Sequence, residues 1–373
     1  MVYKFEQIAY NITAKRSPNK DDMSSYIGLE HLESGSLDVT SFGSKVEIKG
    51  DKLIMTKGDV LLGKRNAYLR RAAIAPHDGL FSAHGMILRP KEDVIDPKYF
   101  PFFIASDIFF DEAIRISVGG LSPTINWKDL KELEFTLPSL SEQKVLADKL
   151  WAAYRVKESY KKLLAATDDM LKAKFQEMFG EEGEKYSIKD LFELQMGKTP
   201  DRQNSLYWTQ GKHKWFSIAD MSKSNIYSKD TDEYISDLAV EKSGIKKVKK
   251  GTVFMSFKLT IGKVLIASED VYTNEAIMAF NERFPYEAET GLRISKKWIY
   301  YTFLYKDWLE NAAQAVKGRT LNKESIGNSN IIVPKYELQQ QFVEIATQAE
   351  ATKESLRKSI ENIDQVIKSL INQ

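Results

Sequence analysis

The chain has 373 residues, more than one ordinary domain, and 43% of them are hydrophobic. A net charge of +2 neither requires nor excludes a nucleic-acid partner, because a basic surface can be offset elsewhere in the chain. The lack of cysteine excludes disulfides and thiolate metal sites, the first residues have no apolar signal core, and no apolar run is long enough to cross a membrane. We therefore expect a cytoplasmic protein with no membrane contact.

Residues 1–138 mix short helical and strand-like segments. A helical motif, FEQIAYNITAKRSP, precedes a strand-like segment at Tyr26–Leu32 and a strand pair in TKGDVLLGKRNAYLRRAAIA, where Gly58 marks a turn. An aromatic helix is predicted from Asp96 to about Ser117. This mixture of elements indicates an α+β domain.

Residues 139–180 are predicted to form one long helix. Pro138 precedes it, Ser139 with Glu142 three residues on indicates a capping box, and Gly180 ends it. Apolar residues follow a heptad seam, which Lys157, Thr167 and Lys174 interrupt. The seam consists of Leu146, Leu150, Ala153, Tyr160, Leu164, Leu171 and Met178.

Residues 181–334 repeat the first pattern after a short charged linker, EEGEK. IKDLFELQMGKTP is followed by a strand-like Trp215–Met221, by a strand pair in VKKGTVFMSFKLTIGKVLIA, and by an aromatic helix from Ser295 to about Val316. Gly251 takes the place of Gly58 as the turn before the strand pair. The two copies are therefore expected to share one scaffold.

A second long helix is predicted over residues 335–373. Gln339 stands five residues after Pro334, as Gln143 stands five after Pro138. The seam continues through Phe342, Ile345, Ala349, Leu356, Ile363, Val366 and Leu370. We expect the two helices to form an antiparallel coiled coil about 55 Å long, with the two copies at its opposite ends. The predicted interface residues are Leu146, Leu164, Leu171, Leu356, Ile363 and Val366.

The motifs of common catalytic sites are missing from the sequence. Gly58 to Lys64 has the spacing of a phosphate-binding loop, but Arg65 replaces the hydroxyl residue that would hold Mg²⁺. The four histidines lack metal-ligand spacing, and the sequence contains no Gly-x-Ser-x-Gly, no Asn/Asp-Pro-Pro-aromatic and no Gly-x-Gly-x-x-Gly motif. We therefore assign no catalytic, metal or cofactor-binding residue.

Basic residues beside turns recur in both copies and are the candidates for DNA contacts. Lysines suit phosphates, whereas Asn66, Thr260 and the neighbouring arginines suit base edges. For any single residue an ordinary solvated loop surface is the competing interpretation, and the aromatic helices are interpreted as core rather than as stacking surfaces. The candidates are Lys15, Arg16, Lys64, Arg65, Asn66, Arg70, Arg71, Lys198, Arg202, Lys249, Lys258, Thr260, Lys263, Lys317 and Arg319.

The order of these motifs resembles the DNA specificity subunit of type I restriction-modification systems. LPSLSEQKVLADKL and its echo VPKYELQQQFVEIA are similar to the family's helix start, in which an apolar residue and proline precede Glu-Gln. Gly197 to Pro200 resembles the start of a recognition domain, and the turns at Gly119 and Gly318 resemble those before the helix. Leu338-Gln339 departs from the usual Glu-Gln.

The resemblance implies two target-recognition domains that read a split, asymmetric site in double-stranded DNA. It implies a non-catalytic subunit bound to two methyltransferase subunits, which carry S-adenosylmethionine and methylate adenine, and to a translocating restriction subunit. A related type IIB-like system and a coiled-coil protein-interaction scaffold without DNA binding stay open as alternatives. A stand-alone enzyme is disfavoured by the missing motifs.

Overall fold

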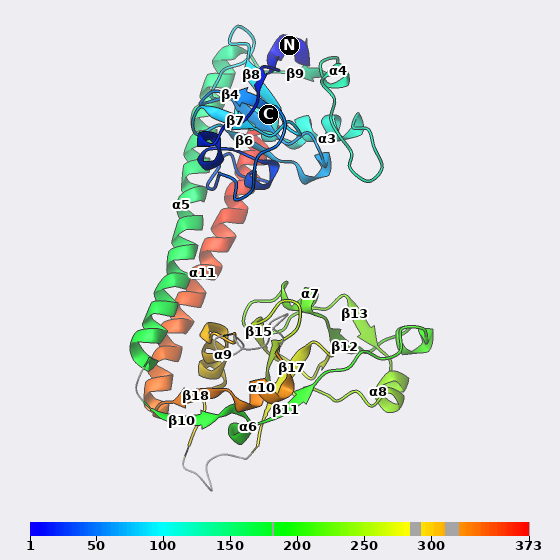
Figure 1. The fold of residues 1–373 in the computed structure, drawn as a ribbon, viewed down its shortest axis with the longest axis vertical. Coiled ribbons are helices and arrows are strands. Elements are labelled where there is room, and N and C mark those ends of the chain that lie inside the picture. Colours follow the sequence, from blue (N-terminus) through cyan, green and yellow to red (C-terminus); the bar gives the residue numbers. More distant parts are fainter. Residues whose placement is uncertain (181–182, 284–291, 310–320, 373) are drawn as a thin grey trace. The chain divides into compact units, whose positions relative to one another are not determined.

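The computed structural model describes residues 1–180, 183–283, 292–309 and 321–372. These residues divide into two compact units, one comprising Met1–Leu163 with Ser355–Gln373 and the other Leu164–Glu354. Each unit mixes short strands with helices and contains part of both long helices, α5 (Leu140–Phe179) and α11 (Tyr336–Ile371), shown in Figure 1. The predicted α+β class is confirmed, while the division into the four segments 1–138, 139–180, 181–334 and 335–373 stays a prediction.

In the first unit a four-stranded antiparallel sheet has the order β2-β8-β5-β6. A second sheet has the order β3-β4-β7, and β1 pairs with β9. The strands are β1 (Val2–Lys4), β2 (Ala9–Ile12), β3 (Lys15–Arg16), β4 (Lys52–Met55), β5 (Val60–Leu62), β6 (Ala72–Ile74), β7 (Gly79–Phe81), β8 (Met86–Pro90) and β9 (Glu134–Thr136). The helices, besides α5 and α11, are α1 (Phe5–Ile8), α2 (Phe100–Ala105), α3 (Asp107–Arg115) and α4 (Trp127–Leu130).

The second unit repeats this scaffold. Its four-stranded sheet has the order β11-β17-β14-β15, β10 pairs with β18, and a three-stranded sheet has the order β13-β12-β16. The strands are β10 (Glu184–Ser187), β11 (Phe192–Met196), β12 (His213–Phe216), β13 (Glu233–Ile235), β14 (Val253–Ser256), β15 (Val264–Ile266), β16 (Tyr272–Thr273), β17 (Ile277–Glu282) and β18 (Asn330–Val333). The shorter helices are α6 (Ile188–Leu191), α7 (Ile218–Met221), α8 (Asp237–Ser243), α9 (Lys296–Tyr305) and α10 (Lys323–Asn328).

The predicted strand-like segment Tyr26–Leu32 is wrong. Residues Leu29–His31 form a 3₁₀ turn, which the His31 ring closes by accepting the Gly28 amide proton at 2.9 Å through Nδ1. In the second copy only the first part of Trp215–Met221 is strand, because Ser217 accepts the Asp220 amide proton and begins α7. Local side-chain hydrogen bonds to the backbone thus override strand propensity at both places.

Aromatic residues of α2, α3 and α9 form the cores, as the sequence predicted. In the first unit Phe103 and Phe109 pack against Phe135 with ring centroids 5.2 and 5.9 Å away. In the second, Phe303 lies 4.4 Å from Phe280, centroid to centroid. The single aromatic helix expected from Asp96 is instead two helices, because Ser106 leaves the helical conformation and caps α3.

The glutamine near the start of each long helix is buried and makes the same three hydrogen bonds in both units. Gln143 accepts the amide proton of Asp96 at 2.8 Å and donates to the carbonyls of Val94 (3.2 Å) and Pro138 (3.0 Å). Gln339 does the same with Ser295 (2.8 Å), Arg293 (3.0 Å) and Pro334 (2.9 Å). We call these two sets of bonds the glutamine clamps. They fasten the first turn of each long helix to the segment that precedes α2 or α9.

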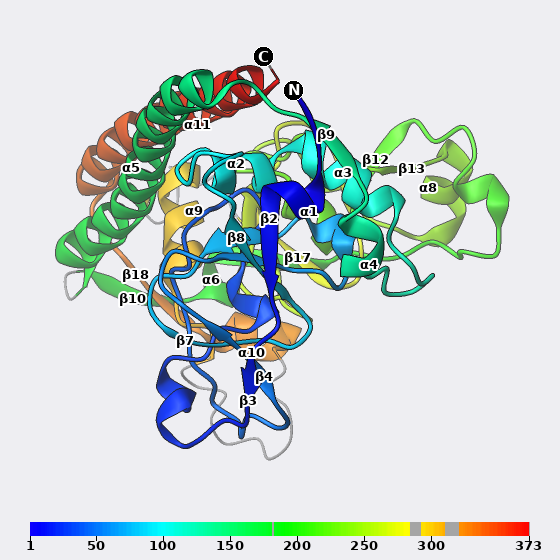
Figure 2. The same cartoon turned by 90° about the horizontal axis from the view of Figure 1, so that it is seen from above.

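The two long helices run antiparallel within each unit, side by side in both views (Figures 1 and 2). In the first unit Lys157 of α5 forms an ion pair with Asp364 of α11, at 2.5 Å. In the second, Lys353 of α11 forms one with Asp168 of α5, at 2.6 Å. Both lysines are buried and lie 196 residues apart in the sequence, the same offset that separates the glutamine clamps. A buried charge with a single cross-helix carboxylate favours one register of the two helices.

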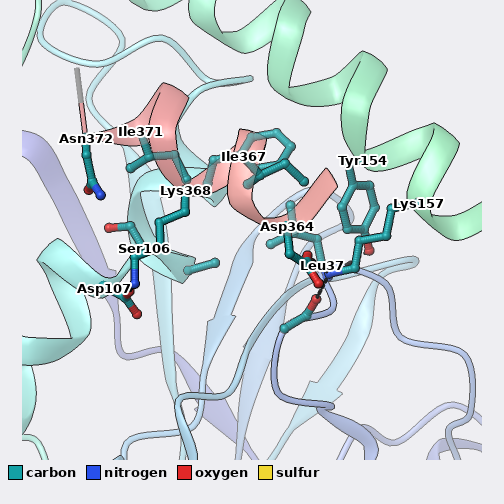
Figure 3. Close-up of a pocket in the computed structure, with 13 residues that line it drawn as sticks. Leu37, Ser106, Asp107, Tyr154, Lys157, Asp364, Ile367, Lys368, Ile371 and Asn372 are labelled. Atoms are coloured by element: carbon teal, nitrogen blue, oxygen red, sulfur yellow. Dashed lines mark hydrogen bonds and ion pairs between the residues drawn. The ribbon is translucent and has the colours of Figure 1, made fainter. Parts of the chain in front are cut away.

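The seam differs from the predicted one at Val366, which is 51% exposed. Ile367 and Ile371, together with the predicted Leu370, pack against the core of the first unit. An α-helix rotates about 20° per heptad relative to a strict seven-residue repeat, so the apolar face moves off the predicted stripe near its end. Figure 3 shows this end of α11 beside Tyr154 of α5 and α3, around a cavity of about 230 Å³.

Candidate nucleic-acid interface

The loop between β5 and β6 holds the largest group of predicted residues in the first unit. Asn66 takes a left-handed conformation with φ 56° and accepts a hydrogen bond from the Ser122 hydroxyl at 2.7 Å. Arg65 donates through Nε to the same hydroxyl at 3.0 Å, and the Lys64 carbonyl accepts the Ile125 amide proton at 2.9 Å. The loop is therefore preorganised by the segment that leads into α4.

Lys64, at the start of this loop, is half-buried. Burial lowers the pKa of Lys64, and the positive charge of Lys15 lowers it further. Arg65, the next residue of the loop, is exposed, whereas Lys15 lies in β3.

The loop between β14 and β15 takes the same topological place in the second unit. It carries the predicted Lys258, Thr260 and Lys263, and Thr260 is exposed to solvent. Lys263 donates to the Ser222 hydroxyl, and Lys258 lies 5.3 Å from the centre of the Phe257 ring. The structure therefore brings these three candidates together on one hairpin.

Several predicted arginines instead have partners within the chain. Arg16 makes a bidentate pair with Asp22, with both distances 2.6 Å, and this hydrogen bonding holds the pKa of Asp22 below its ordinary value. Arg70 pairs with Asp107 at 2.7 Å and also with Asp111. Arg71 donates to the Leu29 carbonyl at 2.7 Å. These bonds support loops, so base reading by these arginines stays a prediction.

Arg202 is held in the second unit by both charge and stacking. It pairs with Glu233, and its guanidinium lies 3.8 Å from the centre of the Trp208 ring and 4.8 Å from that of Trp215. Lys198, predicted beside it, donates to the Ser243 carbonyl. Cation–π contact and a bidentate carboxylate together indicate a positioning role for Arg202.

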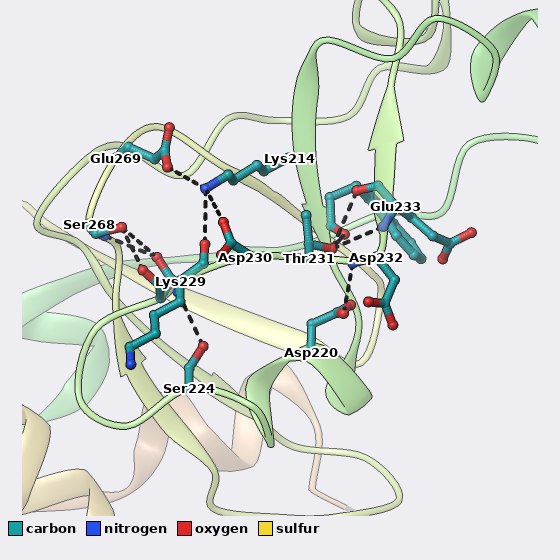
Figure 4. A network of polar contacts seen from close by, with 12 residues as sticks. Lys214, Asp220, Ser224, Lys229, Asp230, Thr231, Asp232, Glu233, Ser268 and Glu269 are labelled. Carbon is teal, nitrogen blue, oxygen red and sulfur yellow. Dashed lines mark hydrogen bonds and ion pairs between the residues drawn. The ribbon is translucent and has the colours of Figure 1, made fainter. Parts of the chain in front are cut away.

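Figure 4 shows the polar network that holds the segment leading to Glu233. Asp220 is 2% exposed and accepts the Asp232 amide proton at 3.1 Å. Burial opposes its charge, but hydrogen bonds from Ser217 and from the Asp232 amide leave the pKa of Asp220 below its ordinary value. Lys214 adds ion pairs to Glu269 (2.7 Å) and Asp230 (3.3 Å).

Lys249 lies in a pocket of about 440 Å³ that is lined by four lysines and two glutamates and that the sequence did not reveal as a unit. Lys247, Lys250 and Lys296 also line it. Lys247 pairs with Asp270 at 3.3 Å, whereas Lys249, Lys250 and Lys296 have no ion pair in the part of the chain that the structure describes. Lys296 belongs to α9, and no spacing rule links it to the other three lysines, so the sequence could not place it here.

The remaining predicted residues, Lys317 and Arg319, lie outside the described residues. Among residues 1–180, 183–283, 292–309 and 321–372, no group of histidine, aspartate and glutamate side chains could hold a metal ion. No helix within these ranges is long and apolar enough to cross a membrane. What the described sites offer is positive charge and hydrogen-bond donors on loops.

Comparison with known proteins links both copies to one family. A family model described as type I restriction modification DNA specificity domain matches residues 3–166 and again residues 180–365. A Methanocaldococcus jannaschii protein named as a type I restriction enzyme MjaX specificity subunit is 23% identical over 98% of this chain and 89% of its own length. The type I restriction enzyme EcoDI specificity subunit of Escherichia coli is 26% identical over 38% of this chain and 31% of its own length.

Solved structures support the same fold. A chain from a structure described as the basis of complex assembly and conformational transition of the type I R-M system matches with TM-score 0.59 and 17% identity, over 100% of this chain and 96% of that chain. The type I restriction-modification S subunit from M. genitalium matches with TM-score 0.56 and 12% identity, over 100% and 94%. At these identities the likeness is one of fold alone.

Proposed function

The chain belongs to the type I restriction modification DNA specificity family, with one recognition domain in each copy, and on that premise we propose how it works. The chain selects the DNA site and carries out no chemistry itself. Each copy reads one half of a split, asymmetric target in double-stranded DNA. The observation that carries this proposal is the twofold match, since one scaffold occurs twice with different loops.

The partners follow from the family. The chain would hold two methyltransferase subunits, which bind S-adenosylmethionine and methylate adenine, and a restriction subunit that translocates DNA in the cytoplasm. The similarity to MjaX and EcoDI specificity subunits favours the type I system over a type IIB-like one. S-adenosylmethionine belongs to the partner subunits in this proposal.

The basic residues supply binding that does not depend on sequence. Lys15, Lys64 and Lys249 would contact phosphates, while the loops between β5 and β6 and between β14 and β15 enter the major groove. The net charge of +2 is too small for strong binding by the chain alone, so we expect weak binding that strengthens with the methyltransferase subunits. Binding should weaken steeply with salt, because each phosphate contact releases counterions.

The test is to co-express the chain with the methyltransferase subunit encoded beside it and to map methylated adenines in the host genome by single-molecule sequencing. A bipartite, asymmetric methylated sequence is the expected result. Methylation without sequence preference, or the failure of the complex to bind duplex DNA in a gel-shift assay, would overturn the proposal and favour an interaction scaffold.

A further inference from the structure

The loop between β14 and β15 displays a leucine that local packing does not explain. Leu259 is 96% exposed and has φ 61°, in the left-handed region that large side chains rarely adopt. Single exposed leucines are common on protein surfaces. An exposed leucine in a strained conformation is unusual, and strain of this kind concentrates at functional sites.

The loop is anchored to the core on both sides of this leucine. Phe257 is 1% exposed in the core of the unit, and Ile261 packs against the same core. The buried Ser256 donates its hydroxyl proton to the Thr260 carbonyl at 2.5 Å and accepts the Lys263 amide proton at 3.1 Å. Phe257, Leu259 and Ile261 are alternate residues of the loop. The first and the last pack against the core, whereas Leu259 between them is exposed.

The lysines near Leu259 indicate the kind of ligand that this leucine would contact. Lys258 and Lys263 lie on the same hairpin, and the proposed function places this hairpin against DNA. The two lysines suit the phosphates on either side of a groove. In the major groove the apolar feature of the base edges is the 5-methyl group of thymine.

The first unit has a counterpart at the same topological place. Its β5–β6 loop presents Tyr68, which is 56% exposed, between the left-handed residues Asn66 and Arg70. Two copies of one scaffold thus each display a large side chain among basic residues on a strained loop. The side chains differ, as two readers of different half-sites require.

Resting on the proposed function, we propose that Leu259 is a specificity-determining residue that reads a thymine by contact with its 5-methyl group. The β14–β15 hairpin enters the major groove of the half-site read by the second copy. The anchored residues on either side hold the leucine in this strained conformation before DNA binds, which reduces the ordering cost of binding.

The test uses the full chain in complex with its methyltransferase subunit and duplexes of the mapped target in which one thymine at a time is replaced by uracil. Removing the methyl group at one position should weaken binding by wild type about fourfold, as expected for the loss of one buried carbon. Leu259→Ala should bind the unmodified target about fourfold more weakly. It should then show no further loss with uracil at that position.

Two matched variants serve as controls. Leu206→Ala removes another exposed leucine of the same unit, 62% exposed, and should leave the thymine response as in wild type. Tyr68→Ala changes the other copy and should also preserve this response. Circular dichroism of each variant verifies that the fold is retained.

The inference is overturned if no thymine shows this non-additive loss while wild type remains sequence-specific, or if Leu206→Ala behaves like Leu259→Ala. It is also overturned if Leu259→Ala weakens all duplexes equally, the result expected of a wedge between base pairs. A wild-type complex without any sequence preference would instead contradict the proposed function.

Discussion

The β5–β6 and β14–β15 loops occupy one place in two copies of a scaffold but are stabilised differently. In the first copy the Arg70 guanidinium is neutralised by Asp107 and Asp111 of α3. In the second, the buried Ser256 hydroxyl organises the loop, and Lys258 is half-buried beside the Phe257 ring. The sheets that carry the loops have the same strand order. The comparison shows one sheet order in both copies with loops that differ in sequence and in the bonds that hold them.

Of the changes considered, replacing one whole copy should have the largest effect, and the effect should appear in the methylated DNA sequence. If residues 186–334 are exchanged for the matching domain of a relative, one half of the methylated sequence should change completely and the other half should persist. Independent reading follows from the separate cores of the two units. Genome-wide mapping of methylated adenine measures the result, and exchange of residues 1–138 is the reciprocal control. A change in both halves after either exchange would contradict independent reading.

Loss of either glutamine clamp should destabilise the folded chain by the same amount. Gln143→Leu or Gln339→Leu removes three hydrogen bonds from buried backbone groups, and each should lower the free energy of unfolding by about 3 kcal/mol. Urea denaturation measures this loss. Hydrogen exchange adds a local signal, since the Asp96 amide should lose protection only in Gln143→Leu and the Ser295 amide only in Gln339→Leu.

Gln341→Leu is the matched control for the clamps, because Gln341 is exposed on α11. It should change neither the urea midpoint nor the protection of either amide. Equal destabilisation by this exposed substitution would show that the clamps have no special role.

The two cross-helix ion pairs should differ in strength. Asp364→Ala leaves Lys157 buried with the Gly35 carbonyl as its remaining partner, at 3.2 Å, and should cost about 3 kcal/mol. Asp168→Ala leaves Lys353 with Glu350, at 2.9 Å, so about 1 kcal/mol is expected. Urea denaturation of both variants, with the exposed Asp169→Ala as control, measures the difference. If Asp364→Ala and Asp168→Ala lost equal free energies of unfolding, Glu350 would not be compensating Lys353 for the missing Asp168.

A smaller effect, which depends on pH, is expected at the Arg16–Asp22 pair. A carboxyl group whose pKa is lowered on folding adds stability above its ordinary pKa, and this stability is lost as pH falls through the folded value. Wild type should therefore exceed Asp22→Asn by about 1 kcal/mol at neutral pH. The difference should shrink as pH falls below the ordinary value of 3.8. Denaturant titrations at several pH values test this.

The pair in the other unit provides the contrast. Arg202 and Glu233 are both substantially exposed, at 49% and 38%, so Glu233→Gln should cost about 0.5 kcal/mol. A cost larger than that of Asp22→Asn at neutral pH would show that stacking on Trp208 depends on the carboxylate.

The long helices and the repeated order of elements could be predicted from the sequence, because capping and periodicity are local signals. The predicted capping box is present, with the Ser139 amide donating to Glu142 at 2.8 Å. Lys157, which interrupts the predicted apolar seam of α5, is buried and forms an ion pair with Asp364. The sequence could not reveal this pair because Asp364 lies on the other long helix. Val366 was misplaced since a heptad rule ignores the rotation of the apolar face.

The candidate site was less predictable, because the sequence reveals residue types but not their partners. Arg70 and Arg202 look like Arg65 in the sequence, yet the first two pair with carboxylates 31 or more residues away. Lys296 joins Lys249 in one pocket only through the packing of α9. Which of these residues contact DNA stays a prediction that the proposed experiments address.

The glutamine clamps have a consequence for how such a chain can evolve. All six of their bonds are made to main-chain amides and carbonyls, none to a neighbouring side chain. A joint of this kind does not depend on the amino acids around it, so a foreign domain that follows the same backbone path can be joined without further adaptation. Recombination between genes could then exchange whole reading modules and create new specificities in one event, whereas stepwise substitution would have to pass through poorly discriminating intermediates.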